Sequence, residues 1–308
     1  MEQSFTPYQP ASFIPEGVPQ SPKIGKFKAS RMIVSASWNM LKEDKEMLLF
    51  PILSGMASTI ASVILVLAYV FVAAGFEVSK LTTVAQAEAE QTSAVVNIAF
   101  LLTLYITTYF IATFFQAGIV TIAHGRINGR DLAFRDGMNV ATAHIGKIFL
   151  WSTLSATVGL VLRLIAERSK LLGRIVIALV GAAWSIVSYF IVPVLILEEL
   201  SVVGSLKKSA ETIKRSWGET AIVNIGVGLF FFILTLLGML VLAGLLFTQQ
   251  PILIFTGLAL FLVYVLALSV ISSTLNIIFK VVLYEYVTKG TVPQGFSDEL
   301  LHSAFKVK

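Results

Sequence analysis

The 308-residue sequence contains no cysteine and only three histidines. Without cysteine the chain has no disulfide, no thiolate nucleophile and no cysteine-ligated metal or iron–sulfur site. No two of the histidines, His124, His144 and His302, have the spacing of a metal-ligand pair, so we expect no metal centre and no cofactor. The sequence also lacks the motifs of phosphate-binding loops, dinucleotide-binding folds, serine hydrolases and zinc proteases. We therefore expect no catalytic residues and a protein that is not an enzyme.

Charged residues are scarce as well, at 13% of the chain, whereas hydrophobic residues make up 56%. Most of the hydrophobic residues fall in six runs, at about residues 47–75, 94–123, 148–166, 172–197, 221–247 and 252–279. A helix needs about 20 apolar residues to cross a hydrocarbon core of about 30 Å, and each run approaches or exceeds this length. The sequence therefore predicts an all-α fold, a polytopic membrane helical bundle with six transmembrane helices in three hairpins.

The N-terminal region has a different composition. Residues 1–29 are polar, contain five of the nine prolines and show no periodicity. A segment of this kind cannot bury a core, so we expect a disordered cytoplasmic tail. Residues 30–308 are expected to form a single six-helix transmembrane domain.

A short basic segment precedes each pair of runs, at roughly residues 30–45, 131–146 and 204–217. Apolar residues recur at helical spacing in the second and third segments, as Phe134, Met138, Ala141 and Ile145, and as Leu206, Ala210, Ile213 and Trp217. The cations of the third segment fall on the other side of the helix: Lys207, Lys208, Lys214 and Arg215. These patterns predict amphipathic helices that lie in the headgroup plane with their cations toward anionic lipids. The alternative is that each segment extends the adjoining transmembrane helix into the cytoplasm.

The distribution of Lys and Arg sets the expected orientation. Cations are concentrated in the segments on the side of both termini, whereas loop 76–93 contains only Lys80 and turn 248–251 contains none. Because cytoplasmic loops carry the excess of cations, we expect both termini in the cytoplasm of a multi-pass protein of the plasma membrane. This also explains the net charge of +5 without a nucleic-acid partner.

Loop 163–174 departs from this distribution. It carries four cations, Arg163, Arg168, Lys170 and Arg174, although the number of spans places it outside. One interpretation is that one of the two middle runs does not span; we favour two spans, with Arg163 reaching the interface from a helix end. The cations then form either a patch for lipid headgroups or an acidic partner, or a solvated turn, and we favour the turn.

Polar residues within the runs are neutral and clustered. In the last run Ser269, Ser273 and Asn276 lie on one helical stripe, and the second run offers Gln116. One hypothesis is that these side chains line a polar path or a headgroup pocket. The other, which we favour, is that they bond neighbouring helices or their own helix backbone and so stabilise packing. Pro193 in the fourth run is expected to kink that helix.

Three stretches carry a resemblance to a known family. They are SWNMLKEDKEMLLFPILSG (37–55), ERSKLLGRIVIALVGAAWSIVSYFIVPVLILEEL (167–200) and SLKKSAETIKRSWGE (205–219). The chain resembles an uncharacterised prokaryotic integral-membrane family with six spans. More loosely it is similar to the membrane domain attached to some glycerophosphodiester phosphodiesterases. The resemblance implies fold and membrane location and supplies no catalytic residues.

Two classes of function remain. The first, which we favour, is a non-enzymatic scaffold or accessory protein that contacts anionic membrane lipids through its basic helices, with other membrane proteins as further partners. The second is a transporter or channel for a neutral or lipidic solute, lined by the stripe of Ser269, Ser273 and Asn276. A continuous polar path past this stripe would favour the second class.

Overall fold

The computed structural model of the protein describes residue 35 and residues 37–74 and 94–289. The predicted disordered tail at 1–29, the predicted outer loop at 76–93 and the C-terminal residues after 289 lie outside the described residues. Residues 37–43 are helical. They are followed by a short 3-10 helix and then by α-helices: η1 (Lys45–Leu48), α2 (Leu49–Ala73), α4 (Ala94–Ile127), α5 (Phe134–Ala143), α6 (Ile145–Arg168), α7 (Leu171–Val187), α8 (Ile191–Leu197), α9 (Val202–Leu246) and α10 (Pro251–Lys289).

Six helical stretches are long and apolar enough to cross a membrane. They are Lys45–Ala73, Ala94–Ile127, Ile145–Arg168, Leu171–Leu197, Gly228–Leu245 and Pro251–Lys289. Each coincides with one of the runs predicted from the sequence. The predicted all-α fold with six spans is therefore confirmed.

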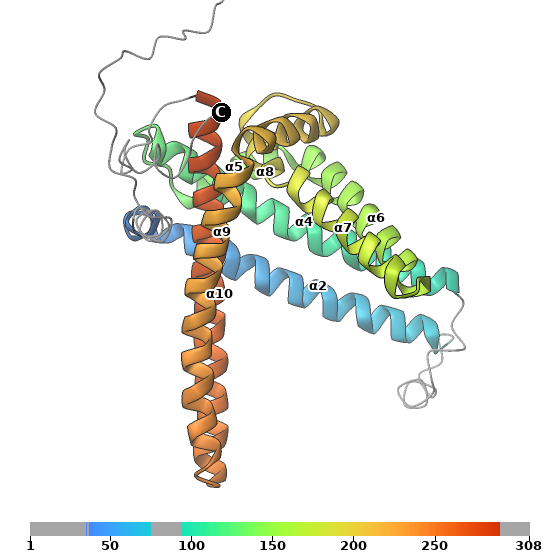
Figure 1. Ribbon diagram of the computed structural model, residues 1–308, viewed down its shortest axis with the longest axis vertical. Helices are drawn as coiled ribbons and strands as arrows, with labels where there is room; N and C mark the ends of the chain where they lie inside the picture. Colours follow the sequence, from blue (N-terminus) through green and yellow to red (C-terminus); the bar gives the residue numbers. More distant parts are fainter. Residues whose placement is uncertain (1–34, 36, 75–93, 290–308) are drawn as a thin grey trace, which may run out of the picture.

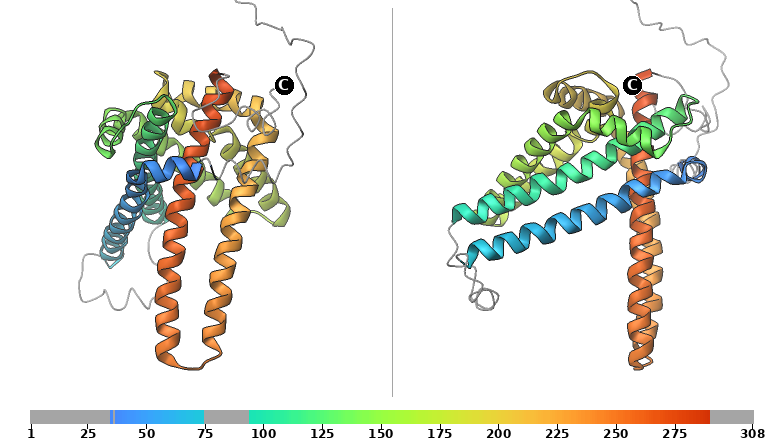
Figure 2. Two further views of the ribbon diagram at one scale, coloured as in Figure 1. Left: turned by 90° about the vertical axis from the view of Figure 1, so that its left-hand side faces the viewer. Right: turned by 180° about the vertical axis from the view of Figure 1, so that it is seen from behind.

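The helices form two arms that diverge from a shared core. One arm consists of α2, α4, α6 and α7, and the other is the long hairpin of α9 and α10 (Figure 1). Figure 2 shows both arms from two further sides, with the hairpin projecting away from the other helices. The core, which we call the hub, lies where the arms meet. Its largest fully buried side chains are Phe50, Phe190, Phe279, Met47, Ile119, Ile122, Ile148, Leu195, Ile278 and Leu283.

Two connections between paired spans are described, and both lie at ends of the arms away from the hub. The α6–α7 turn lies beside the end of α2 and the start of α4, and the α9–α10 turn closes the hairpin at its far end (Figure 1). Loop 163–174 therefore shares its end of the molecule with residues 73 and 94, as the two-span interpretation requires.

The fourth span is broken near Pro193, where the sequence predicts a kink. Helix α7 ends at Val187 and α8 begins at Ile191. Pro193 has no N–H to bond the carbonyl of Tyr189 one turn earlier, and its ring clashes with that carbonyl, so a continuous helix is disfavoured here.

A side chain from α9 bridges this break. The backbone N–H of Phe190 donates to Ser209 Oγ at 3.0 Å, and the Ser209 hydroxyl donates to the carbonyl oxygen of Val187 at 2.7 Å. Ser209 is fully buried. One hydroxyl therefore satisfies a donor and an acceptor that the broken helix leaves without helical partners.

The second basic segment forms a separate helix, α5, as expected, but its apolar stripe packs on protein. Phe134 and Met138 contact the hub, and the ring centroids of Phe134 and Phe50 are 4.6 Å apart. Ala141 is fully buried, whereas Ile145 at the end of the stripe is exposed. Most of the stripe is therefore covered by the hub and is not presented outward to lipid.

Two glycines permit this close packing. A Cβ placed on Gly118 of α4 would lie 2.0 Å from Phe50 Cε1, and one on Gly137 of α5 would lie 2.9 Å from the carbonyl oxygen of Gly118. Only glycine fits at these two positions without displacing a neighbour.

The third basic segment does not form a separate helix. It is the first part of α9, which begins after Ser201 and continues to Leu246. The Ser201 hydroxyl caps this helix by accepting from the N–H of Gly204 at 3.2 Å. For this segment the alternative prediction, that it extends the adjoining span, agrees with the structure.

Candidate functional site between the arms

A pocket of about 330 Å³ lies between α2 and α4 of one arm and α10 of the other. Its polar lining residues are Ser54 of α2, Gln116 of α4, and Ser269 and Ser273 of α10, and we call it the Ser/Gln pocket. Three of the four residues predicted as a polar stripe therefore lie at one site. Ser54 was missed, because a single serine in an apolar run gives no pattern in the sequence.

The polar groups of the Ser/Gln pocket have no hydrogen-bond partners in the part of the chain that the structure describes. Within the described residues, the side chains of Ser54, Gln116, Ser269 and Ser273 make no hydrogen bond. Many other hydroxyls of the spans instead donate to the carbonyl one turn earlier, as Thr103 Oγ1 does to Ala99 at 2.8 Å. The helix-bonded interpretation fits these other hydroxyls, and the pocket residues differ from them.

Asn276, the remaining residue of the predicted stripe, does not line this pocket. Its side-chain amide donates to the carbonyl oxygen of Ser272 at 2.9 Å. Asn276 therefore bonds its own helix, as the packing interpretation expects.

Three of the polar residues of the Ser/Gln pocket lie at similar distances along their helices from the hub. Counted from the predicted hub-side ends of the spans at 47, 123 and 279, its residues Ser54, Gln116 and Ser273 each lie about 10 Å along their helices. The remaining lining is apolar except for backbone groups, and no ionisable side chain lines the pocket. The site can therefore offer neutral hydrogen-bond donors and acceptors at the edge of an apolar surface.

Several charged residues lie in the hub, beyond the Ser/Gln pocket. The Asp44 carboxylate pairs with the Arg126 guanidinium, which donates from Nε to Asp44 Oδ2 at 2.6 Å. Nη2 of Arg126 also lies 2.8 Å from Asp131 Oδ1. The Asp44 side chain is only 9% exposed and that of Arg126 27%, so this pair is largely removed from solvent. It joins η1 to α4.

A second group joins α10 to α4 and to the end of α8. Glu285, which is buried, lies 2.8 Å from His124 Nδ1 and 2.7 Å from Lys289 Nζ. The Tyr284 hydroxyl donates to the Glu198 carboxylate. Tyr284 is buried and packs in the hub. These contacts tie the end of the hairpin arm to the other helices.

The sequence analysis did not identify these charged groups as partners. His124 and Arg126 end the second run, and Glu285 and Lys289 end the last helix. Residues of opposite charge that lie at the same ends of neighbouring spans are expected to lie at a similar level and can pair. Their common position at the span ends is the sequence signal that could have predicted these ion pairs.

The predicted headgroup-binding cations form two separate groups. Arg168, Lys170 and Arg174 are exposed near the α6–α7 turn, whereas Lys207 and Lys214 are exposed and Lys208 is half-buried on the hub end of α9. The side chain of Arg215 lies outside what the structure describes.

Arg163 differs from the other cations because its guanidinium already has partners. Its Nε lies 2.8 Å from Glu167 Oε1, and its Nη1 donates to the Tyr105 hydroxyl at 3.0 Å. Arg163 therefore links α6 to α4, which reduces its availability to lipid.

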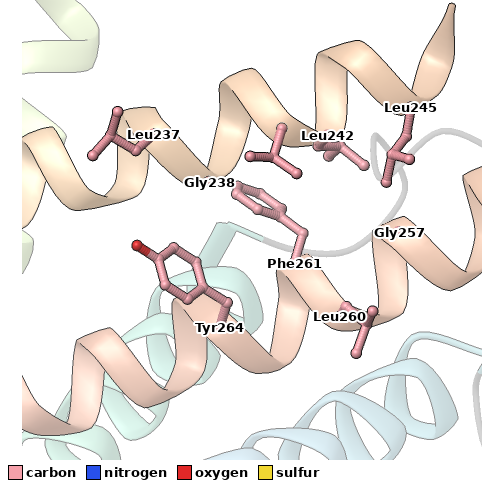
Figure 3. A pocket seen from close by; sticks show the side chains of 9 residues that line it. Leu237, Gly238, Leu242, Leu245, Gly257, Leu260, Phe261 and Tyr264 are labelled. Carbon is pink, nitrogen blue, oxygen red and sulfur yellow. The ribbon is translucent and has the colours of Figure 1, made fainter.

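A further pocket lies within the hairpin arm, between α9 and α10 (Figure 3), and has a volume of about 380 Å³. Its lining is apolar apart from Tyr264, whose hydroxyl donates to the Leu234 carbonyl oxygen at 2.8 Å. Gly238 faces the Tyr264 ring, where an added Cβ would lie 2.6 Å from it. This pocket has no side-chain polar group left to recognise a ligand.

Residues 95–295 match the model of a family of unknown function (DUF6159). The matched region covers most of the chain, so the protein belongs to this family, in agreement with the uncharacterised membrane family predicted from the sequence. No curated protein and no solved structure matches the chain.

Proposed function

We propose that this member of a family of unknown function is a non-catalytic integral membrane protein that binds a neutral amphipathic molecule in the Ser/Gln pocket. The observation that carries the proposal is the convergence, on one pocket between the arms, of four polar side chains from three helices that have no partner among the described residues. Polar groups that face hydrocarbon without partners are unfavourable, so a hydrogen-bonding ligand would stabilise them.

The lining supports a neutral ligand. Hydroxyl and amide groups can donate and accept hydrogen bonds, whereas a charged ligand at this depth would need an opposite charge that the pocket lacks. An amide such as that of Gln116 and hydroxyls such as that of Ser273 suit an ester, alcohol or amide head. The apolar surroundings suit a ligand with hydrocarbon chains.

The size of the pocket supports binding of the head of such a molecule alone. A volume of 330 Å³ is at the low end for small-molecule sites, which span roughly 300–1,000 Å³. Ser269 and Ser273 are exposed, so the pocket opens to the membrane. The chains of the ligand would then lie along the exposed apolar faces of α2 and α10.

Binding accounts for the geometry better than a continuous channel. The hub lies directly beyond the pocket, and Phe50, Ile119 and Ile278 there are fully buried. Ile119 itself lines the pocket. A solute would have to displace this core to continue toward the hub side.

The distribution of Lys and Arg over the loops supports a place in the plasma membrane with the hub on the cytoplasmic side. In that orientation Lys207 and Lys214 on α9 face the leaflet that is rich in anionic lipids, which are the expected surface partners. The cations of the α6–α7 turn would lie on the outer side.

A second candidate function is that of an accessory protein in a membrane assembly. The spans bury little against one another; none of the most apolar 18-residue window of Lys45–Ala73 or of Ala94–Ile127 is buried. Such faces are suited to lipid and to other membrane proteins alike. Purification in mild detergent would reveal a stoichiometric partner protein if this candidate holds.

The pocket can be tested with a photoactivatable diacylglycerol analogue added to the full-length protein in lipid nanodiscs. Cross-links are expected on the peptides of α2, α4 and α10 that line the pocket. In the double variant Gln116→Leu/Ser273→Ala we expect about thirtyfold less cross-linking at a subsaturating concentration of the analogue, because two hydrogen bonds of about 1 kcal/mol each are lost.

The matched control is Thr103→Val/Ser185→Ala, which removes two hydroxyls that bond their own helices. This control should cross-link as the unaltered protein does. Labelling spread over all spans, or equal in both double variants, would show that the Ser/Gln pocket is not a binding site.

A further inference from the structure

We propose that a third pocket, at the hub end of the protein, binds an ammonium–phosphate zwitterion, with its phosphate on Arg130 and its ammonium group on Asp136. The pocket has a volume of about 440 Å³ and is formed by α4, the α4–α5 turn, α5 and α8. We call it the Arg130 pocket. It shares no residue with the Ser/Gln pocket, so the two proposals stand independently.

The backbone at the end of α4 fixes the position of Arg130. The N–H of Arg130 donates to the carbonyl of Gly125 at 2.8 Å, and the N–H of Gly129 donates to that of Arg126 at 3.1 Å. Gly129 has a φ of 70°, which favours glycine. These two bonds are those of a Schellman C-cap, so Arg130 leaves the helix in a defined direction.

The Arg130 guanidinium is available for a ligand. Within the described residues it makes no ion pair or hydrogen bond, and its side chain is exposed. Arg126, four residues earlier, is instead occupied by Asp44 and Asp131. A free guanidinium at a pocket suits phosphate, to which it can donate two parallel hydrogen bonds.

The opposite charge is set in place by the start of α5. Asp136 Oδ2 accepts from the backbone N–H of Ala133 at 2.9 Å. This contact holds the carboxylate at the first turn of the helix, and its other oxygen accepts no hydrogen bond from the residues that the structure describes. No ion pair joins Asp136 to Arg130 among the described residues. The two charges line one pocket without neutralising each other.

This arrangement favours a zwitterion over a simple anion. An anion on Arg130 would be repelled by Asp136, whereas a ligand with both charges satisfies each side chain. His124 also lines the pocket, but its Nδ1 already faces Glu285, and Glu285 is balanced by Lys289.

The remaining walls fit a compact polar group with an apolar extension. Asn139 is exposed at the pocket and has no hydrogen-bond partner among the described residues, so its amide can bond a phosphate oxygen. Leu132, Val140 and Leu197 supply apolar contacts. Phosphoethanolamine is the smallest group with this chemistry, either as a lipid headgroup or as a free molecule.

Retention of lipid by the purified full-length protein tests this assignment. The protein is reconstituted in nanodiscs of phosphatidylcholine that contain equal small amounts of phosphatidylethanolamine and phosphatidylglycerol, then released into neutral detergent and analysed by native mass spectrometry. We expect phosphatidylethanolamine to be retained about tenfold over the other two, because only its primary ammonium can donate a charged hydrogen bond to Asp136.

Two variants assign the roles of the charged residues. Arg130→Gln should lower retention of both phosphatidylethanolamine and phosphatidylglycerol, whereas Asp136→Asn, which keeps an acceptor for Ala133, should lower retention of phosphatidylethanolamine alone. Arg135→Gln is the matched control, because Arg135 is exposed on α5 and does not line the pocket. If Arg130→Gln does not fold, Arg130→Lys can be used in its place. It keeps the positive charge but cannot donate two parallel hydrogen bonds to phosphate, so it should give intermediate retention.

Soluble O-phosphoethanolamine, added to the lipid-loaded protein, distinguishes the two sources of the ligand. Displacement of the lipid supports the zwitterion site and identifies a free ligand as able to use it; retention of the lipid supports the site as one for a headgroup. Equal retention of the three lipids, a preference for phosphatidylglycerol, or variants that behave as the Arg135→Gln control would overturn the proposal.

Discussion

The hub and the arms are stabilised in different ways. In the hub, charged and polar side chains join residues far apart in the chain, such as Asp44 and Arg126, which are 82 residues apart. In the arms, hydroxyls such as those of Thr103 and Ser185 bond their own helices, and the apolar faces remain exposed. The arms also have polar contacts between helices, as between Arg163 and Tyr105. The buried ion pairs, however, lie in the hub.

The bilayer explains this difference. Lipid chains are as apolar as the helix faces, so the arms gain little hydrophobic stabilisation by packing on each other. The hub combines a dense apolar core with polar contacts that fix its geometry. The arms can therefore diverge, and the Ser/Gln pocket lies where they begin to do so.

The largest expected difference between the two regions comes from their ion pairs. Asp44→Ala in the hub should lower the free energy of unfolding by about 3 kcal/mol, because Arg126 is left as a largely buried charge that Asp131 only partly compensates. Denaturation with SDS in detergent micelles measures this. In the arm, Glu167→Ala removes the exposed partner of Arg163 and should cause no measurable change. Similar losses in both variants would contradict a stabilising role confined to the hub.

Glycine substitutions should have opposite signs in the two regions. Gly118→Ala in the hub should destabilise by about 2 kcal/mol, because the new methyl group would lie 2.0 Å from Phe50 Cε1. Gly228→Ala in the hairpin arm meets no atom within 4 Å and should stabilise the helix by up to about 1 kcal/mol. Thermal unfolding followed by circular dichroism compares them, and a stable Gly118→Ala variant would show that the hub is loosely packed.

Tyrosine hydroxyls offer a finer comparison. Tyr284→Phe removes a hydrogen bond to the Glu198 carboxylate and should lower the free energy of unfolding by about 1.5–2 kcal/mol. Tyr264→Phe removes a bond to the neutral carbonyl of Leu234 in the hairpin arm and should lower it by about 1 kcal/mol or less. SDS titration measures the free energy of unfolding of both variants. A larger loss for Tyr264→Phe than for Tyr284→Phe would contradict the stronger stabilisation of the hub.

The smallest effect is expected for hydroxyls that bond their own helix. Thr103→Val should change the free energy of unfolding by less than about 0.6 kcal/mol, because the carbonyl of Ala99 keeps its helical hydrogen bond. SDS titration of this variant beside the unaltered protein measures the difference. A change comparable to that of Tyr284→Phe would mean that the arm relies on its polar groups after all.

The spans and the break in the fourth span could be predicted because they depend on local properties. Runs of apolar residues specify the spans, and Pro193 specifies an interruption one turn before it. The helical spacing of Ser269 and Ser273 likewise placed them on one face of α10.

The hub contacts and the divergence of the arms could not be predicted in this way. The pairing of Glu285 with His124, or of Tyr284 with Glu198, depends on which helices meet, and no sequence spacing encodes that. Nor does the sequence show that Asn276 bonds Ser272 while Ser273 stays unpaired, because both share the same stripe pattern. The difference depends on which side of α10 faces the neighbouring helices.

The bridge made by Ser209 has a consequence for biosynthesis. The fourth span contains a break whose backbone groups at Val187 and Phe190 are satisfied by a residue of the following helix. While the chain grows, these groups stay unpaired until Ser209 has left the ribosome, which disfavours their burial in lipid. The fourth span can therefore adopt the conformation described above only after the beginning of α9 has been made.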